Sequence, residues 1–179
     1  MAKEKRAGSR RAGRRGRRFQ WFVGIAVVVA LAGAGAYWFW PQAWDQPGQF
    51  FPSLGNQHLA TPDTPHAPYN TDPPTSGPHL AYVAPWGIHT VPIPRELQVH
   101  NLEDGGVLVQ YNCECPELVA KLRPIVERYK DRVILAPYPT MKTRIALTAW
   151  TRIDAFNDFE ERRIVRFIEA YHGIDHHAR

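Results

Sequence analysis

The sequence has few of the residues that staple small proteins together or carry familiar catalytic chemistry. Only two cysteines occur in 179 residues, whereas a small secreted domain that depends on disulfide bonds for its stability normally carries more. There is no Gly-rich phosphate loop, no Gly-x-Ser-x-Gly nucleophile motif, no His-Glu-x-x-His zinc motif and no internal repeat. These absences leave the common nucleotide-dependent and hydrolytic enzyme classes without support.

Long apolar runs are also absent, with one exception at residues 19–40. This run has a single strongly polar member, Gln20, and nine Lys or Arg residues lie immediately before it. A helix of roughly 20 apolar residues crosses the hydrocarbon core of a bilayer, and basic flanks stay in the cytoplasm. We therefore predict a basic cytoplasmic tail at residues 1–18, a single-pass transmembrane helix at residues 19–40, and an extracytoplasmic location for the chain from Pro41 onward.

The end of the run favours a membrane anchor over a cleaved signal peptide. Residues 37–40 read Tyr-Trp-Phe-Trp, and bulky aromatics are poor cleavage residues but suit the membrane–water interface. The alternatives are an atypical signal cut near Ala34 or Ala36 and a twin-arginine signal.

The basic residues are concentrated in the tail. Its nine basic residues and Glu4 give a formal charge of +8, while 13 basic and 16 acidic residues give the rest of the chain −3. The cluster therefore indicates membrane topology and contact with anionic lipid rather than nucleic-acid binding.

Composition divides the remainder into an irregular segment and a patterned one. Residues 41–70 are rich in Pro, Gly, Asn and His and are predicted to form a Pro-rich linker or wrapping arm. Residues 71–175 are predicted to form one extracytoplasmic α+β domain, followed by a His-containing tail at residues 176–179. The expected core is a strand at 106–111, a helix from 116 to about 130, strands at 132–136 and 144–150, and a helix at about 157–172. A thioredoxin-like arrangement is one interpretation of this order.

Local signals place the ends of both helices. Pro116 suits the first helical position, and Pro124 should bend the helix or end it early. Asn157, with Glu160 three residues later, resembles a capping box. Gly173 is expected to terminate the second helix.

The two cysteines, Cys113 and Cys115, lie between the first strand and Pro116, at a predicted helix start. The partial positive charge of a helix N-terminus favours a thiolate, the form that binds soft metals and attacks disulfides. Three interpretations remain open: a metal site, a redox couple of the thioredoxin-like kind, or a structural disulfide or two inert thiols. The close spacing constrains a disulfide tightly, which argues against the structural disulfide and also weakens the redox couple.

Histidines are the other candidate ligands, and all eight lie beyond the apolar run. His79 ends a rigid Pro-rich turn and His100 lies shortly before the cysteine strand, so these two are the best candidates, although a hydrogen-bonded structural role is as common for an imidazole. Met141, the only methionine besides the initiator, is an outer candidate. Structural roles are expected of His58, His66 and His89. Loose metal binding is expected of the C-terminal histidines, His172, His176 and His177.

Five motifs together resemble the bacterial family called domain of unknown function 3105. The motifs are Asp72-Pro-Pro-Thr-Ser-Gly-Pro-His79, His100-Asn-Leu-Glu-Asp-Gly-Gly-Val107, Gln110-Tyr-Asn-Cys113, Ala136-Pro-Tyr-Pro139 and Ala146-Leu-Thr-Ala-Trp150. The resemblance covers residues 70 to 175. The resemblance implies a membrane-anchored protein with its domain outside, and no established activity. The family usually has a second His where Asp104 stands here, and it spaces its cysteines more widely. From the residues themselves, Glu103 and Asp104 are expected to stabilise a turn.

These observations lead to one main hypothesis and two alternatives. The main hypothesis is an anchored extracytoplasmic domain that handles or delivers a soft or borderline metal, Cu(I) first or else Zn(II), without catalytic turnover. His79, His100, Cys113 and Cys115 would be its ligands, with Met141 as an outer one. The first alternative is a structural or docking module for a membrane-protein partner, and the second is a thioredoxin-like thiol–disulfide oxidoreductase.

Overall fold

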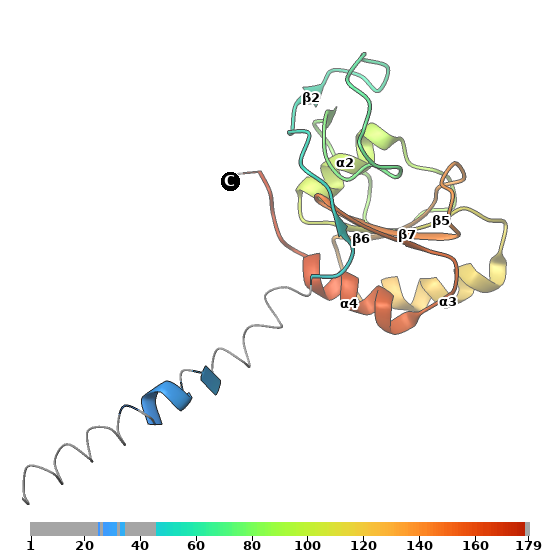
Figure 1. The fold of residues 1–179 in the computed structure, drawn as a ribbon. Helices are drawn as coiled ribbons and strands as arrows, with labels where there is room; N and C mark the ends of the chain where they lie inside the picture. The colour runs from blue at the N-terminus through green and yellow to red at the C-terminus, as the bar shows by residue number, and fades with distance from the viewer. Residues whose placement is uncertain (1–24, 26, 32, 35–45, 178–179) are drawn as a thin grey trace, which may run out of the picture. The chain divides into compact units, whose positions relative to one another are not determined.

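A computed structural model describes residues 25, 27–31, 33–34 and 46–177 (Figure 1). The chain divides into two compact units, the first ending at Gln46 and the second beginning at Pro47. The described residues between 25 and 34 are helical. In the part of the chain that the structure describes, no helix has the length and apolar character needed to cross a bilayer. The predicted cytoplasmic tail and most of the predicted membrane span lie outside the described residues.

The second unit is a mixed α+β domain, as the sequence predicts, and it is built on a six-stranded sheet of which three strands were predicted. Its strands lie in the order β1 (Gln49–Phe50), β8 (Arg152–Phe156), β7 (Ile145–Ala149), β5 (Val107–Tyr111), β6 (Val133–Pro137) and β4 (Gly87–Ile88). The β4, β6 and β5 strands are parallel, and the pairs β5–β7, β7–β8 and β8–β1 are antiparallel. The central strand β5 places Val109 between Leu135 of β6 and Leu147 of β7.

Helices cover both faces of the sheet (Figure 1). The helices α3 (Pro116–Val126) and α4 (Glu161–Tyr171) pack on one face, and α2 (Arg95–Glu103) lies on the other. Val107 and Val109 of β5 belong to the α3–α4 core, while Leu108 packs with Leu102 of α2. This alternation follows from the two-residue period of a strand. Because both faces are covered, nearly all of β5 is buried.

The helix ends are partly as predicted. Pro116 occupies the first turn of α3, and the helix ends at Val126, two residues beyond Pro124. Pro124 lies on the exposed side of α3, where water can satisfy the carbonyl that a proline leaves unpaired. The predicted capping box is wrong: Asn157 accepts a hydrogen bond from the Arg144 backbone, and α4 begins after Glu160 without a side-chain cap. The chain leaves α4 at Gly173, whose φ is +80°.

The segment before the sheet is more ordered than a linker. Residues 46–70 contain β1, which pairs with β8, and β2 (His58–Leu59), which pairs in parallel with β3 (His79–Leu80). The Pro-rich turn leading to β3 has a cis peptide at Asp72–Pro73 and a positive φ at Gly77. This β2–β3 layer lies against α2 on the side of the sheet opposite α3 and α4 (Figure 1).

Candidate metal site

Four side chains from three elements meet at one point between the β2–β3 layer and α2. They are His58 of β2, His79 of β3, and His100 and Glu103 of α2. Each offers one ligand atom, and these atoms all lie within 4.8 Å of one another. We call these four residues the inner cluster.

The fold explains why these side chains converge. His58 and His79 are direct partners in the β2–β3 pairing. His100 and Glu103 are three residues apart and therefore share one face of α2. The three imidazoles form a triangle with ring centroids 5.0 to 5.4 Å apart. His58 is exposed, whereas the other three residues are buried.

The His79 ring is held in one orientation by a backbone carbonyl. Its Nδ1 lies 2.7 Å from the Gly77 carbonyl oxygen. Because a carbonyl can only accept, Nδ1 carries the hydrogen and Nε2 of a neutral ring carries a lone pair. A histidine whose other nitrogen donates to a carbonyl in this way is the usual arrangement for a metal ligand.

The Glu103 carboxylate lies beside this nitrogen. His79 Nε2 and Glu103 Oε2 are 2.9 Å apart, and both side chains are fully buried. The distance is that of an ion pair, yet neither atom makes a hydrogen bond of acceptable geometry. The other carboxylate oxygen, Oε1, accepts a hydrogen bond from Asn56 Nδ2 at 2.9 Å, which leaves Oε2 directed into the cluster.

Unsatisfied buried atoms are confined to this cluster. Among the described residues, three buried side-chain N or O atoms lack a hydrogen-bond partner, and they belong to His79, His100 and Glu103. Elsewhere on α2, Gln98 bonds to Ile93 and Gln110, and Asn101 makes two hydrogen bonds to Ala84. An unmet buried polar atom costs about 1–3 kcal/mol. Because all three belong to residues whose ligand atoms lie close together, this cluster is the candidate metal site.

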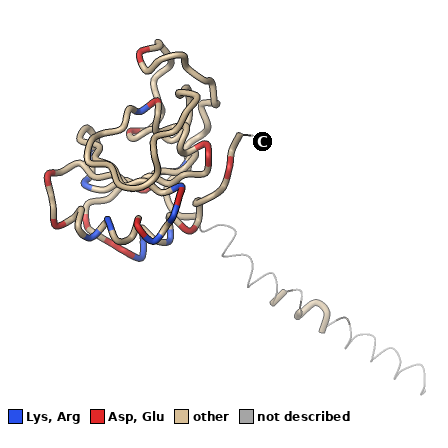
Figure 2. The backbone as a smooth tube through the Cα atoms, turned by 180° about the vertical axis from the view of Figure 1, so that it is seen from behind, with Lys and Arg blue, Asp and Glu red and all other residues tan. Residues whose placement is uncertain are grey.

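Electrostatics also favour a cation here. Residues 47–94, which include His58 and His79, contain no Lys or Arg, whereas α3 and α4 together contain five (Lys and Arg positions are blue in Figure 2). Burial lowers the pKa of His100, although Asp104 acts in the opposite direction. The His100 ring is therefore kept neutral, which is the form that binds metals.

A second group shares His100 with the inner cluster. His100, Asp104 and His177 also offer ligand atoms within 4.8 Å of one another. Their exposure differs, because His100 is buried and the other two are partly or fully exposed. His100 Nε2 lies 3.8 Å from Asp104 Oδ1, and the buried Nδ1 of His100 has no hydrogen-bond partner.

Comparison with known proteins places the chain in one family. Residues 62–178 match the family described as protein of unknown function (DUF3105). The chain belongs to this family. The DUF3105 region includes both cysteines and all members of the two ligand groups except His58. No curated protein and no solved structure matches the chain.

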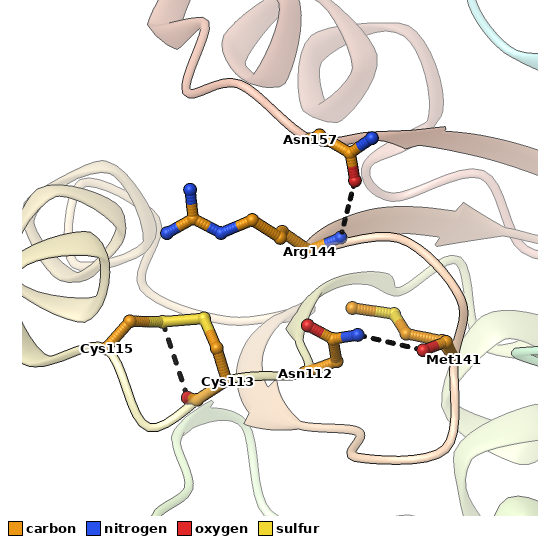
Figure 3. Close-up of a disulfide and its surroundings, with 6 residues drawn as sticks. All are labelled: Asn112, Cys113, Cys115, Met141, Arg144 and Asn157. Atoms are coloured by element: carbon orange, nitrogen blue, oxygen red, sulfur yellow. Dashed lines mark hydrogen bonds between the residues drawn. A yellow bond between two sulfur atoms is a disulfide. The ribbon is translucent and has the colours of Figure 1, made fainter.

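The cysteines of the DUF3105 region do not join the histidines, contrary to the sequence prediction. Cys113 and Cys115 form a disulfide with each other at the start of α3 (Figure 3). The cysteines follow the carboxyl end of β5. His100 lies near the amino end of β5, because the carbonyl of its neighbour Asn101 accepts a hydrogen bond from the Gly106 N–H, just before that strand. A five-residue strand separates these ends by roughly 13 Å.

Met141 is not an outer ligand of the inner cluster either. Its side chain is buried with Tyr138 and Ala146. Its carbonyl accepts a hydrogen bond from Asn112, the residue before Cys113 (Figure 3). Met141 therefore belongs to the packing of the cysteine end of the sheet.

Sequence reasoning missed two members of the inner cluster. His58 was expected to have a structural role and Glu103 to stabilise a turn, but both contribute ligand atoms. His66 and His89 have the structural contacts expected of them, each with a ring nitrogen 2.7 Å from a backbone carbonyl oxygen. His172, which was grouped with the loosely metal-binding C-terminal histidines, also has a ring nitrogen 3.0 Å from a backbone carbonyl oxygen, that of Asp131.

Proposed function

We propose that this domain binds one metal ion through His58, His79, His100 and Glu103, and that it stores or delivers this ion rather than using it for catalysis. The observation that carries the proposal is the set of three buried atoms without partners, each on a residue of the inner cluster. A bound cation would remove the cost of each one at once. The Gly77 carbonyl and Asn56 would act as the outer partners that orient His79 and Glu103.

The donor atoms select among metals. Three imidazole nitrogens and one carboxylate oxygen suit Zn(II) or Cu(II), whereas Cu(I) prefers sulfur. Because the cysteines bond to each other, the copper(I) site predicted from the sequence loses its thiolates. Four protein ligands are enough for a tetrahedral site, so no substrate is needed to complete the shell. His58 is the exposed member of the set.

The membrane anchor is part of the proposal. Its support is the apolar run at residues 19–40 and the nine basic residues before it. With that orientation the inner cluster would face the extracytoplasmic side. The function would then be metal handling at the outer surface of the cytoplasmic membrane.

Competition titration of the full-length protein in detergent tests the metal site. Zn(II) and Cu(II) are added against a chelator of known affinity. We expect tight 1:1 binding by the wild type. His79→Ala should weaken this binding by about tenfold to a hundredfold, the range for losing important metal-site partners. The control His89→Ala changes a histidine whose ring contacts the Pro85 carbonyl, and its affinity should equal that of the wild type.

A cysteine variant separates this proposal from the sequence prediction. The double variant Cys113→Ser, Cys115→Ser should bind Zn(II) as tightly as the wild type. Loss of binding in this variant would move the site to the sulfurs. Equal binding by the wild type and His79→Ala would reject the inner cluster.

A second candidate function is supported by the disulfide itself. Cys113 and Cys115 lie at the start of α3, directly after the central strand β5. This placement, with strand order β4-β6-β5-β7-β8, resembles that of thioredoxin-like oxidoreductases. A substrate thiolate would attack one sulfur to form a mixed disulfide and release the other as a thiolate. A second substrate thiolate would then attack the substrate sulfur of the mixed disulfide. This step forms a disulfide in the substrate and releases the domain as a dithiol.

Equilibration with glutathione and thiol trapping would test this activity. An exchanging pair should be reduced reversibly by the glutathione couple. A pair that stays oxidised down to about −300 mV would behave as a structural disulfide, and the oxidoreductase would be excluded.

A further inference from the structure

The segment that follows α4 is fixed beside the inner cluster by backbone contacts. The Gly173 N–H donates to the Gly105 carbonyl at 2.8 Å, and the His176 N–H donates to the Glu103 carbonyl at 2.9 Å. A Cβ at Gly105 would lie 2.7 Å from the Ile174 backbone. The close approach therefore depends on glycine there. These contacts hold the segment against the end of α2 that supplies Glu103.

Aromatic packing reinforces this position. The His176 ring stacks on Trp150, with centroids 5.9 Å apart and planes 21° apart. Trp150 also meets His79 edge-on at 6.4 Å. The segment is thus packed against the same indole that borders the inner cluster.

The His177 ring repeats the arrangement of His79. Its Nδ1 lies 2.9 Å from Asp175 Oδ1. A carboxylate can only accept, so Nδ1 carries the hydrogen and Nε2 of the neutral ring has a free lone pair. A carboxylate that orients a histidine in this way is a recurrent outer partner in metal sites.

His177 Nε2 faces the same oxygen as His79. It lies 3.5 Å from Glu103 Oε2 and 3.4 Å from Asp104 Oδ1. Two imidazole nitrogens, one buried and one on the partly exposed His177, therefore approach a single carboxylate oxygen. The His177 ring also lies beside the His100 ring, with centroids 5.5 Å apart.

We propose that His177 is a further ligand of the metal site, and that it retains the ion by closing the inner cluster from the side of residues 174–177. This inference rests on the proposed metal-binding function. A fifth donor would slow release of the ion, since His177 and Glu103 would have to separate before the ion leaves on that side. Exchange would then be controlled by this segment.

A different reading makes His177 only a cation that balances Glu103 and Asp104. The Asp175 hydrogen bond raises the pKa of His177, which fits that role in the metal-free protein. Two substitutions separate the readings. His177→Ala removes both the ligand and the charge, whereas His177→Lys keeps a positive charge near the two carboxylates but loses the imidazole.

The experiment measures release of Zn(II) from the loaded full-length protein into an excess of chromogenic chelator. We expect His177→Ala and His177→Lys each to release Zn(II) about tenfold or more faster than the wild type. The control His172→Ala changes a histidine on the far side of Gly173, whose ring contacts the Asp131 carbonyl. Its release rate should match the wild type.

Co(II) substitution gives a second readout. The visible spectrum of the Co(II) protein should change on His177→Ala, because the coordination number falls. Unchanged release and spectrum in His177→Ala, or wild-type release in His177→Lys, would overturn the role of His177 while leaving the inner cluster intact. A wild-type protein that binds no Zn(II) would overturn both proposals.

Discussion

Replacing Glu103 by Gln changes one buried charge and almost no volume, and it separates a metal site from a structural ion pair. Both side chains of the His79–Glu103 pair are fully buried and 2.9 Å apart. If the pair stabilised the fold as an ion pair, removal of one partner would cost roughly 3–5 kcal/mol. If the two atoms are instead metal ligands without a metal, the substitution should raise the free energy of unfolding of the metal-free protein.

The magnitude follows from the orphaned atoms. The side-chain amide introduced by Glu103→Gln could donate to His79 Nε2 while its oxygen still accepts from Asn56, as the Glu103 carboxylate does at 2.9 Å. Two of the three unmet atoms, His79 Nε2 and Glu103 Oε2, would then be satisfied or removed. Since one such atom costs about 1–3 kcal/mol, we expect the metal-free variant to gain about 1–3 kcal/mol in free energy of unfolding.

Zn(II) should stabilise the wild type more than the Glu103→Gln variant. Free ligand at 100 times its dissociation constant adds about 2.7 kcal/mol to the stability of a protein that binds it only when folded. The wild type should show this increment, and Glu103→Gln should show little of it because the anionic ligand is gone.

Urea unfolding with and without chelator, followed by tryptophan fluorescence, measures both effects. The control Glu169→Gln alters an exposed carboxylate on α4 and should leave stability and the Zn(II) increment within about 0.5 kcal/mol of the wild type. A metal-free Glu103→Gln protein that is less stable by several kcal/mol, or that keeps the full Zn(II) increment, would refute the reasoning.

Three other predictions concern the segment beside the site, two buried tyrosines and the membrane orientation. Gly105→Ala should cost about 1–3 kcal/mol in urea unfolding and speed up Zn(II) release, because φ is +78° and the Ile174 backbone is too close; unchanged values would show that the contact is not needed. Burial raises the pKa of Tyr138 and of Tyr171, so their contribution to stability is complete below pH ~10 and is lost as pH rises through their folded-state values; in Tyr138→Phe this alkaline loss should be smaller. Reporter fusions should show the C-terminal domain outside the cytoplasmic membrane, and a cytoplasmic reporter signal would exclude the anchor orientation of residues 19–40.

The predicted core elements were found because their apolar residues recur at the right period. The β5, α3, β6, β7 and α4 elements appear in the expected order. The β8 strand was missed because most of Arg152–Phe156 is only partly buried and two of its residues are charged, which hides the alternation. The α2 helix was missed because only two of its six buried residues, Val99 and Leu102, are apolar. The other four are polar, so the helix has no continuous apolar stripe: Gln98, His100, Asn101 and Glu103.

The candidate site was predictable only in part, for a related reason. His79 and His100 were selected from local context, and they do meet. The cysteines were added because thiols at a helix start are chemically suited to metals, but nothing local reveals that they and His100 lie at opposite ends of β5. His58 joins the site through its pairing with His79 in β2–β3, a long-range contact that neither segment specifies alone.

X-ray absorption spectroscopy of the Zn(II)-loaded full-length protein tests the central claim most directly, because it identifies the atoms bound to the metal. The inner cluster predicts a shell of imidazole nitrogens and carboxylate oxygen at about 2.0–2.2 Å with no sulfur. A sulfur shell at about 2.3 Å would place the ion on Cys113 and Cys115 and contradict the assignment to His58, His79, His100 and Glu103.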